Sequence, residues 1–159
     1  MEGSNELILS SFNRAHRKMD GLYHDYARRV GLSDAAMWLL YSLCEQEYPC
    51  TQRDLCETWF YAPQTINTAL KSLAEKGFVS LELAPRSRKN KQIYLTEAGK
   101  ALVEGKIIPL IQAEERSFER LGAEERAQLL AITQRHIALL AEEIDNIIGN
   151  ESSEDGSSQ

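Results

Sequence analysis

The sequence predicts a mainly α-helical fold with one small β-hairpin. Apolar residues recur every three or four positions before residue 45 and again after residue 100, as they do along one face of a helix. Between these regions lie two short helical segments, followed by two apolar segments on either side of a basic stretch, which is typical of a hairpin. A helix, a turn, a second helix and a basic two-stranded ribbon are, in that order, the elements of a winged helix-turn-helix.

The composition favours one globular domain. The 159 residues are 43% hydrophobic and 26% charged, which suits a single ordinary core. We expect this domain to span residues 1–148 and a disordered acidic tail to follow at 149–159, where Ser, Glu, Asp, Gly and Gln dominate. No run approaches the ~18 apolar residues of a membrane span, and no apolar secretory segment follows a basic start, so we expect a cytoplasmic protein without membrane contact.

Two helices are predicted before residue 50. Apolar residues spaced three or four apart predict a long amphipathic helix over 7–30, which Gly31 ends. Ser33 is a suitable N-cap for a second helix from Asp34 to about Gln46. Because this second helix is apolar on nearly every side, we expect it to run through the middle of the domain.

The helix-turn-helix is predicted from capping signals. Thr51 followed three residues later by Asp54 resembles a capping box and begins a short helix. Pro63 suits the first position of the next helix, and Gly77 suits its left-handed end. The second helix is expected to bury Ile66, Ala69, Leu70 and Leu73, and to expose Gln64, Thr65, Asn67, Thr68 and Lys71. Exposed hydroxyl, amide and ammonium groups of this kind suit base edges and phosphates.

The hairpin is predicted over 78–83 and 92–95, with a basic tip at 86–91. The formal net charge of the chain is −6, and a negative charge opposes contact with phosphate. The charge is unevenly distributed, however, since residues 53–100 carry eight Lys or Arg against five Asp or Glu. The basic tip therefore indicates a nucleic-acid contact, although such a run also serves as a solvated loop that keeps an edge strand from aggregating.

The remaining sequence predicts helices. Thr96 is expected to cap a helix that Gly99 and Gly105 weaken and that Pro109 kinks or divides. The final helix is expected over about 123–148, with one apolar side.

Several of these residues occur in patterns of a known family. The chain resembles the MarR family of bacterial transcription regulators over nearly its whole expected ordered length. Three motifs carry the resemblance: Thr51-Gln52-x-Asp54-Leu55, Leu73-x-x-x-Gly77-Phe78-Val79, and Ile93-x-Leu95-Thr96-x-x-Gly99.

The resemblance implies a homodimer that binds double-stranded DNA. Residues 5–30 and 107–148 would form the dimerisation helices, and residues 33–100 the winged part. Two recognition helices ~34 Å apart would then enter successive major grooves of a near-palindromic operator, and the protein would act as a ligand-responsive repressor. The apolar first and last helices independently favour a dimer, since a monomer would leave them exposed. The expected DNA-binding residues are Arg53, Gln64, Thr65, Asn67, Thr68, Lys71, Arg86, Arg88 and Lys89.

The chain departs from the family pattern at two positions. The wing usually carries Asp-Arg-Arg, whereas the matching residues here are Ser87-Arg88-Lys89. The recognition helix often has Arg where Thr68 stands. We expect a looser wing, with Arg88 in the minor groove, and an operator that cannot be inferred from relatives.

The resemblance also implies a small aromatic or phenolic effector. Tyr23, Trp38 and Tyr41 are the candidate ligand-binding residues. The alternative is that they are core aromatics, because aromatic residues at helical spacing usually serve packing.

Other classes of function find less support. Cys44, Cys50 and Cys56 form no Cys-x-x-Cys pair, which argues against a disulfide framework or a structural zinc site. A redox-sensing regulator is one alternative function. Cys50 is the best candidate for its low-pKa thiolate, because it lies near a helix N-terminus. The three histidines have no companion ligand at metal-binding spacing, so we expect no metal, no cofactor and no catalytic residues. A winged helix that binds a protein instead of DNA is the other alternative.

Overall fold

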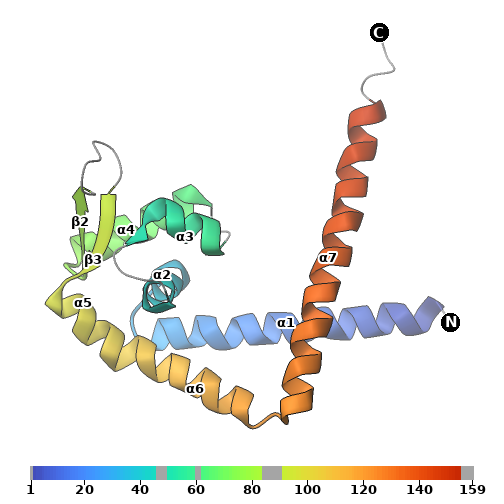
Figure 1. Cartoon of the computed structure of the whole chain (residues 1–159), viewed down its shortest axis with the longest axis horizontal. Helices are drawn as coiled ribbons and strands as arrows, with labels where there is room; N and C mark the ends of the chain where they lie inside the picture. Colours follow the sequence, from blue (N-terminus) through green and yellow to red (C-terminus); the bar gives the residue numbers. More distant parts are fainter. Residues whose placement is uncertain (1, 46–49, 60–61, 84–90, 155–159) are drawn as a thin grey trace. The chain divides into compact units, whose positions relative to one another are not determined.

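The computed structural model describes residues 2–45, 50–59, 62–83 and 91–154, and the chain divides into two compact units, 1–111 and 112–159. Figure 1 follows the elements along the chain. The boundary between the units lies inside the segment 107–148 to which the sequence analysis assigned dimerisation. That assignment, and the single domain over 1–148, remain predictions.

The two N-terminal helices were predicted correctly. Helix α1 spans Glu2–Arg29 and helix α2 spans Asp34–Glu45. Gly31 lies between them with a φ of 78°, a left-handed conformation that glycine adopts without a steric penalty. The Ser33 Oγ accepts a hydrogen bond of 3.2 Å from the backbone N–H of Ala36, which confirms Ser33 as the N-cap of α2.

Helix α2 is the centre of the core of the first unit. Met37, Leu40 and Leu43 on α2 are fully buried, and Figure 1 shows α2 between α1 and the pair formed by α3 and α4. The hydrophobic cluster around α2 takes residues from every other part of the unit, including Ala27, Leu55, Leu73, Ile93 and Ile107. The expectation that this helix runs through the middle of the domain is confirmed for this unit.

Helices α3 and α4 form the helix-turn-helix. Helix α3 spans Gln52–Trp59 and helix α4 spans Pro63–Glu75. The Thr51 N–H donates to the Asp54 carboxylate at 2.7 Å, and the Asp54 N–H donates to the Thr51 hydroxyl at 3.3 Å, so the predicted capping box is present. Pro63 is in the first turn of α4 as expected, and Gly77 after its C-terminus has a φ of 73°.

The sheet has three strands, whereas the sequence predicted two. Strands β2 (Val79–Leu83) and β3 (Lys91–Leu95) form the expected antiparallel hairpin, in which Leu81 pairs with Ile93. Strand β1 (Cys50–Thr51) pairs with the other edge of β3, so the strand order is β1-β3-β2. Two residues are too few to show an alternating pattern, which is why β1 escaped prediction.

The helix after the wing is interrupted by a π-helical turn. Helix α5 spans Glu97–Leu102, the π turn spans Val103–Ile107, and helix α6 spans Ile108–Glu119. The division expected near Pro109 is therefore present, because proline cannot donate its backbone hydrogen bond to the preceding turn. The Tyr26 hydroxyl donates to the Lys106 carbonyl at 2.6 Å and ties the π turn to α1.

The second unit contains the long helix α7, which spans Ala123–Glu154. The Glu125 carboxylate accepts a 2.7 Å hydrogen bond from the Gly122 N–H and so caps the start of α7. Large apolar side chains are exposed along it: Leu129, Leu130, Ile132, Ile137, Leu139, Leu140, Ile144, Ile147 and Ile148.

Helix α7 continues through Glu154, past residue 149 where the tail was expected to begin, and residues 155–159 lie outside the described part of the chain. Neither α7 nor any other described helix combines the length and the apolar character that crossing a membrane requires.

Candidate functional site

Helix α4 presents a polar ridge on the surface of the first unit. The exposure expected from the helical period is confirmed, because the four apolar residues are buried and the polar ones are exposed. We define the α4 ridge as Gln64, Thr65, Asn67, Thr68 and Lys71. The Thr68 hydroxyl donates to the Gln64 carbonyl at 2.9 Å, which leaves its oxygen free to act as an acceptor only.

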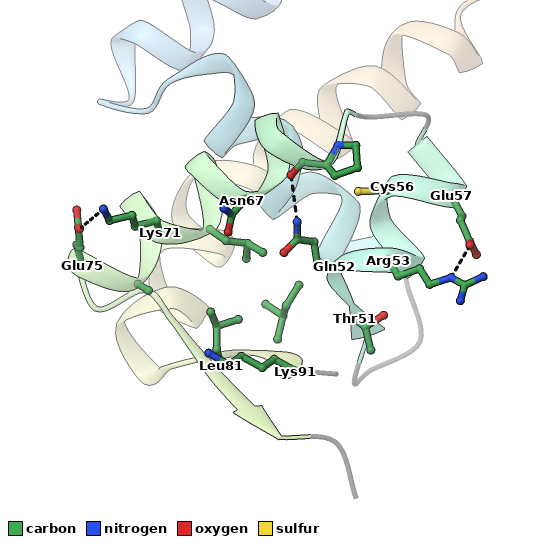
Figure 2. A pocket seen from close by; sticks show the side chains of 14 residues that line it. Thr51, Gln52, Arg53, Cys56, Glu57, Asn67, Lys71, Glu75, Leu81 and Lys91 are labelled. Carbon is green, nitrogen blue, oxygen red and sulfur yellow. Dashed lines mark hydrogen bonds and ion pairs between the residues drawn. The ribbon is translucent and has the colours of Figure 1, made fainter. Parts of the chain in front are cut away.

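The α4 ridge stands between two surface hollows. The wing-side hollow, of about 880 Å³, lies between α3, α4 and the sheet, and Figure 2 shows the residues around it. Asn67 and Lys71 line this hollow, with Leu70, Leu81 and Ile93 as apolar neighbours.

The second hollow, of about 530 Å³, lies on the α2 side of α4. Gln64, Thr65 and Thr68 line it, together with Ser33 at the start of α2. The predicted contact residues of α4 therefore lie on both sides of the α4 ridge, and the ridge projects from the surface between the two hollows. The major groove of DNA is wide enough to admit a helix that projects from the surface in this way.

Each of two cations beside the wing-side hollow has a carboxylate partner one helical turn later. The Arg53 Nε lies 2.6 Å from the Glu57 carboxylate on α3, and the Lys71 Nζ lies 4.0 Å from the Glu75 carboxylate on α4. Dashed lines in Figure 2 mark both pairs. Arg53 and Lys71 were expected at this surface from the sequence but the two glutamates were not, although the i, i+4 spacing could have identified them.

Gln52 is a further residue of this surface that the sequence analysis did not select. Its side-chain amide donates to the Pro63 carbonyl at 3.0 Å, so the first residue of α3 is tied to the first turn of α4 (Figure 2). This contact fixes the start of α4 relative to α3 across the turn. Its sequence separation of 11 residues gives no periodic signal that would have revealed it.

Thr96 holds the base of the hairpin. Its hydroxyl donates to the Gly77 carbonyl at 2.6 Å and accepts from the Gly99 N–H at 3.0 Å, which confirms it as the N-cap of α5. Gly99 packs so closely that a Cβ atom there would lie 1.9 Å from the Phe78 carbonyl oxygen. The end of α4, the start of β2 and the start of α5 thus meet at one point.

The tip of the hairpin lies outside the described residues. This applies to Arg86, Arg88 and Lys89, so the roles expected for them remain predictions. Lys91 begins β3 and lines the wing-side hollow, so one cation of the basic stretch belongs to that hollow.

Known proteins share this architecture. A MarR family regulator from Neisseria meningitidis superimposes with a TM-score of 0.72 at 20% identity, covering 87% of this chain and 96% of that one. The DNA complex of Staphylococcus aureus MepR gives a TM-score of 0.67 at 20% identity, over 82% and 96% of the two chains. The uncharacterised HTH-type transcriptional regulator YwhA of Bacillus subtilis is 34% identical over 83 residues, which are 52% of this chain and 60% of that protein. A MarR family model matches residues 30–89, from the end of α1 into the hairpin.

The helix-turn-helix part of the chain is therefore similar to MarR family regulators. The matched segment contains α2, α3, α4 and β2, and so includes the α4 ridge. This chain spans 60% of the length of the curated B. subtilis relative.

The three aromatic residues expected near a MarR effector cleft lie together. The Tyr23 and Trp38 ring centroids are 4.7 Å apart, and those of Trp38 and Tyr41 are 5.4 Å apart. All three side chains are half-buried and pack against the core of the first unit. Their proximity was expected, and their contact with the core also fits the packing role that was the alternative.

Cys50 does not have the environment expected of a redox-sensing thiolate. It lies on β1 opposite Ile93, and only 2% of it is exposed. Burial and the nearby Asp54 carboxylate raise the pKa of the Cys50 thiol to about 11. The proposed low-pKa thiolate is therefore wrong, because the residue enters a strand and faces the core before α3 begins.

We expect Cys50 to be unreactive in the folded protein. A pKa two units above that of an ordinary thiol lowers the thiolate fraction at pH 8 by about 100-fold, and burial slows the reaction further. Alkylation by iodoacetamide at pH 8, followed by peptide mass spectrometry, measures the rate in the native and urea-unfolded chain. Equal rates at Cys50 in the two states would contradict this environment.

One histidine has a carboxylate partner that the sequence analysis did not find. The His24 Nδ1 lies 2.9 Å from the Asp34 carboxylate, so a side chain near the end of α1 contacts the first residue of α2. The pair was missed because the two residues are ten positions apart and on different helices. Within the described ranges, no three His, Cys, Asp or Glu side chains converge in a way that could hold a metal ion.

Proposed function

We propose that this protein is a sequence-specific DNA-binding transcription regulator, and that it represses by binding a near-palindromic operator as a homodimer. The observation that carries the proposal is the α4 ridge, an exposed row of amide, hydroxyl and ammonium groups between two hollows of a MarR-family winged helix. Binding of this kind requires no catalytic residue and no cofactor.

The chemistry of the ridge supports contacts with both bases and backbone. The amides of Gln64 and Asn67 can donate to and accept from an adenine edge in the major groove. The ammonium groups of Lys71 and Lys91 and the guanidinium of Arg53 line the wing-side hollow, where they suit phosphates. By resemblance, Arg88 contacts the minor groove, and Arg86 and Lys89 contact neighbouring phosphates.

The exposed apolar residues of α1 and α7 support the homodimer. Leu7, Ile8 and Leu22 on α1 and the apolar residues of α7 are exposed in the isolated chain. Apolar patches of this extent are uncommon on monomers and are covered in oligomers by a second copy. The dimer would supply the second recognition helix that a near-palindromic operator requires.

The effector response rests on the family and on the aromatic cluster. A small aromatic or phenolic compound would be bound by Tyr23, Trp38 and Tyr41, whose half-buried rings offer surfaces for stacking. These residues connect α1 with α2, so a ligand there would act on the helix at the centre of the first unit.

The test begins with the selection of duplexes from random pools by the purified protein. Affinity for the selected duplex is then measured by fluorescence anisotropy over a range of salt concentrations. For the Lys71→Ala protein we expect about tenfold weaker binding to selected and random duplexes alike, and a salt dependence flatter by about two, since each dimer loses two phosphate contacts.

Lys100→Ala is the matched control. It removes the same charge from another exposed lysine that is paired with a glutamate, Glu97, but lies on α5 outside both hollows. We expect this variant to bind as the wild type does. Absence of a salt-dependent complex with the wild type would refute DNA binding and favour the protein-interaction alternative, whereas equal losses in the two lysine variants would remove Lys71 from the interface.

A further inference from the structure

Two cations of the wing-side hollow, Arg53 and Lys71, are paired with carboxylates and are therefore less available to a ligand. Arg53 and Lys71 each have a carboxylate within 4.0 Å on the next turn of their own helix. All four side chains are highly exposed, and all four line the same hollow. The pairs therefore lie where the phosphate backbone would approach under the proposed function.

Exposed i, i+4 pairs of this type contribute little to the stability of a fold. They do affect an incoming anion, because a guanidinium that donates to a carboxylate must release it before it can donate to a phosphate in the same direction. The Arg53 Nε donates to the Glu57 Oε1 at 2.6 Å, which is a short charge-assisted hydrogen bond. A phosphate that approaches the Nε side of Arg53 therefore replaces this ion pair instead of adding to it.

We propose that Glu57 and Glu75 limit the affinity for DNA by holding Arg53 and Lys71 away from the phosphate backbone. This inference rests on the proposed function. Because phosphate contacts carry no sequence information, the two glutamates lower the affinity for operator and random DNA by the same factor. They set the strength of binding, whereas the amides and hydroxyls of the α4 ridge set its sequence preference.

The expected effect follows from the strength of such pairs. An exposed i, i+4 ion pair corresponds to about a twofold change in an equilibrium constant. A dimer has two copies of each pair, so we expect Glu57→Gln or Glu75→Gln alone to raise the affinity about fourfold. The pairs lie on different helices and share no atoms, so the double variant should bind about 16-fold more tightly.

The experiment measures the affinities of wild type and variants for one selected duplex and one random duplex at fixed ionic strength. The matched control is Asp25→Asn with Glu97→Gln, which removes two carboxylates from the exposed pairs with Arg28 and Lys100. It gives the same change in net charge but lies outside the wing-side hollow. We expect the double Glu57 and Glu75 variant to gain about 16-fold on both duplexes and the control to gain less than about twofold, because salt screens distant charges.

Removal of the cation tests the mechanism directly. In an Arg53→Gln background, Glu57→Gln should no longer raise the affinity, since there is no guanidinium left to release. A gain that persists in this background, or one that the control variant matches, would overturn the inference while leaving DNA binding intact. A wild type that binds neither duplex would instead overturn the proposed function, and this inference with it.

Discussion

Replacing Gly99 by alanine is expected to destabilise the first unit by about 4 kcal/mol, which is a large share of the stability of an ordinary domain. A Cβ atom at this position would lie 1.9 Å from the Phe78 carbonyl oxygen and 2.9 Å from its carbonyl carbon. Both atoms belong to the backbone, so no side chain can rotate away to relieve the overlap. The hairpin would have to separate from α5, and the Thr96 hydrogen bonds to Gly77 and Gly99 would be strained.

Urea denaturation monitored by circular dichroism measures this effect, and Gly105→Ala is its control. A Cβ atom at Gly105 meets nothing within 4 Å, and alanine is favoured over glycine in helices by about 1 kcal/mol. We therefore expect the Gly105 variant to be as stable as the wild type or slightly more stable. The two variants should be compared at one protein concentration, because dimerisation adds to the measured stability. If the Gly99 variant unfolded at the wild-type urea concentration, the close packing at this point would be disproved.

Replacing Ile137 by glutamate is expected to convert the dimer into a monomer and to abolish detectable operator binding. Ile137 is 61% exposed in the isolated chain, and it lies seven residues from both Leu130 and Ile144, which are also exposed. Positions seven apart share one face of a helix, and apolar residues in this pattern form seams between helices. Burial of an unpaired carboxylate in such a seam opposes association by several kcal/mol, equivalent to more than about 100-fold in the dimer dissociation constant.

The loss of DNA binding would follow from the loss of bivalency. Two linked recognition helices bind an operator with an effective concentration in about the millimolar range, and a monomer loses this advantage. Sedimentation velocity measures the oligomeric state, and fluorescence anisotropy measures the affinity. Ala131→Glu is the control, since it adds the same charge at an exposed position of α7 about 120° around the helix from Ile137. A dimeric Ile137→Glu protein would place the subunit contact elsewhere.

The helix-turn-helix could be predicted well because its signals are local. Ser33, the Thr51 and Asp54 capping box, Pro63 and Gly77 each act within four residues of a helix end, and each was observed in its expected role. The exposed face of α4 followed from helical periodicity for the same reason.

Contacts between distant segments could not be predicted in the same way. Strand β1 forms only because Cys50 and Thr51 meet Ile93 and Gln92, more than 40 residues later in the chain. That pairing buries Cys50, and so it reversed the expectation of a reactive thiolate. The contact of His24 with Asp34 likewise depends on how α1 and α2 pack. The spacing of Glu57 and Glu75 from Arg53 and Lys71 can be read from the sequence. That both pairs line one hollow depends on how α3 and α4 pack, and could not be predicted.

The π turn at Val103–Ile107 has a consequence for relatives of this protein. A π turn contains about one residue more than an α turn, and each residue of an α-helix advances the direction of its side chain by about 100°. Side chains after Ile107 are therefore out of phase with those of α5, and a continuous heptad or 3.6-residue register cannot be drawn through this segment. A homologue that lacks one residue between Leu102 and Pro109 would form an uninterrupted α-helix and still present the same faces of α5 and α6.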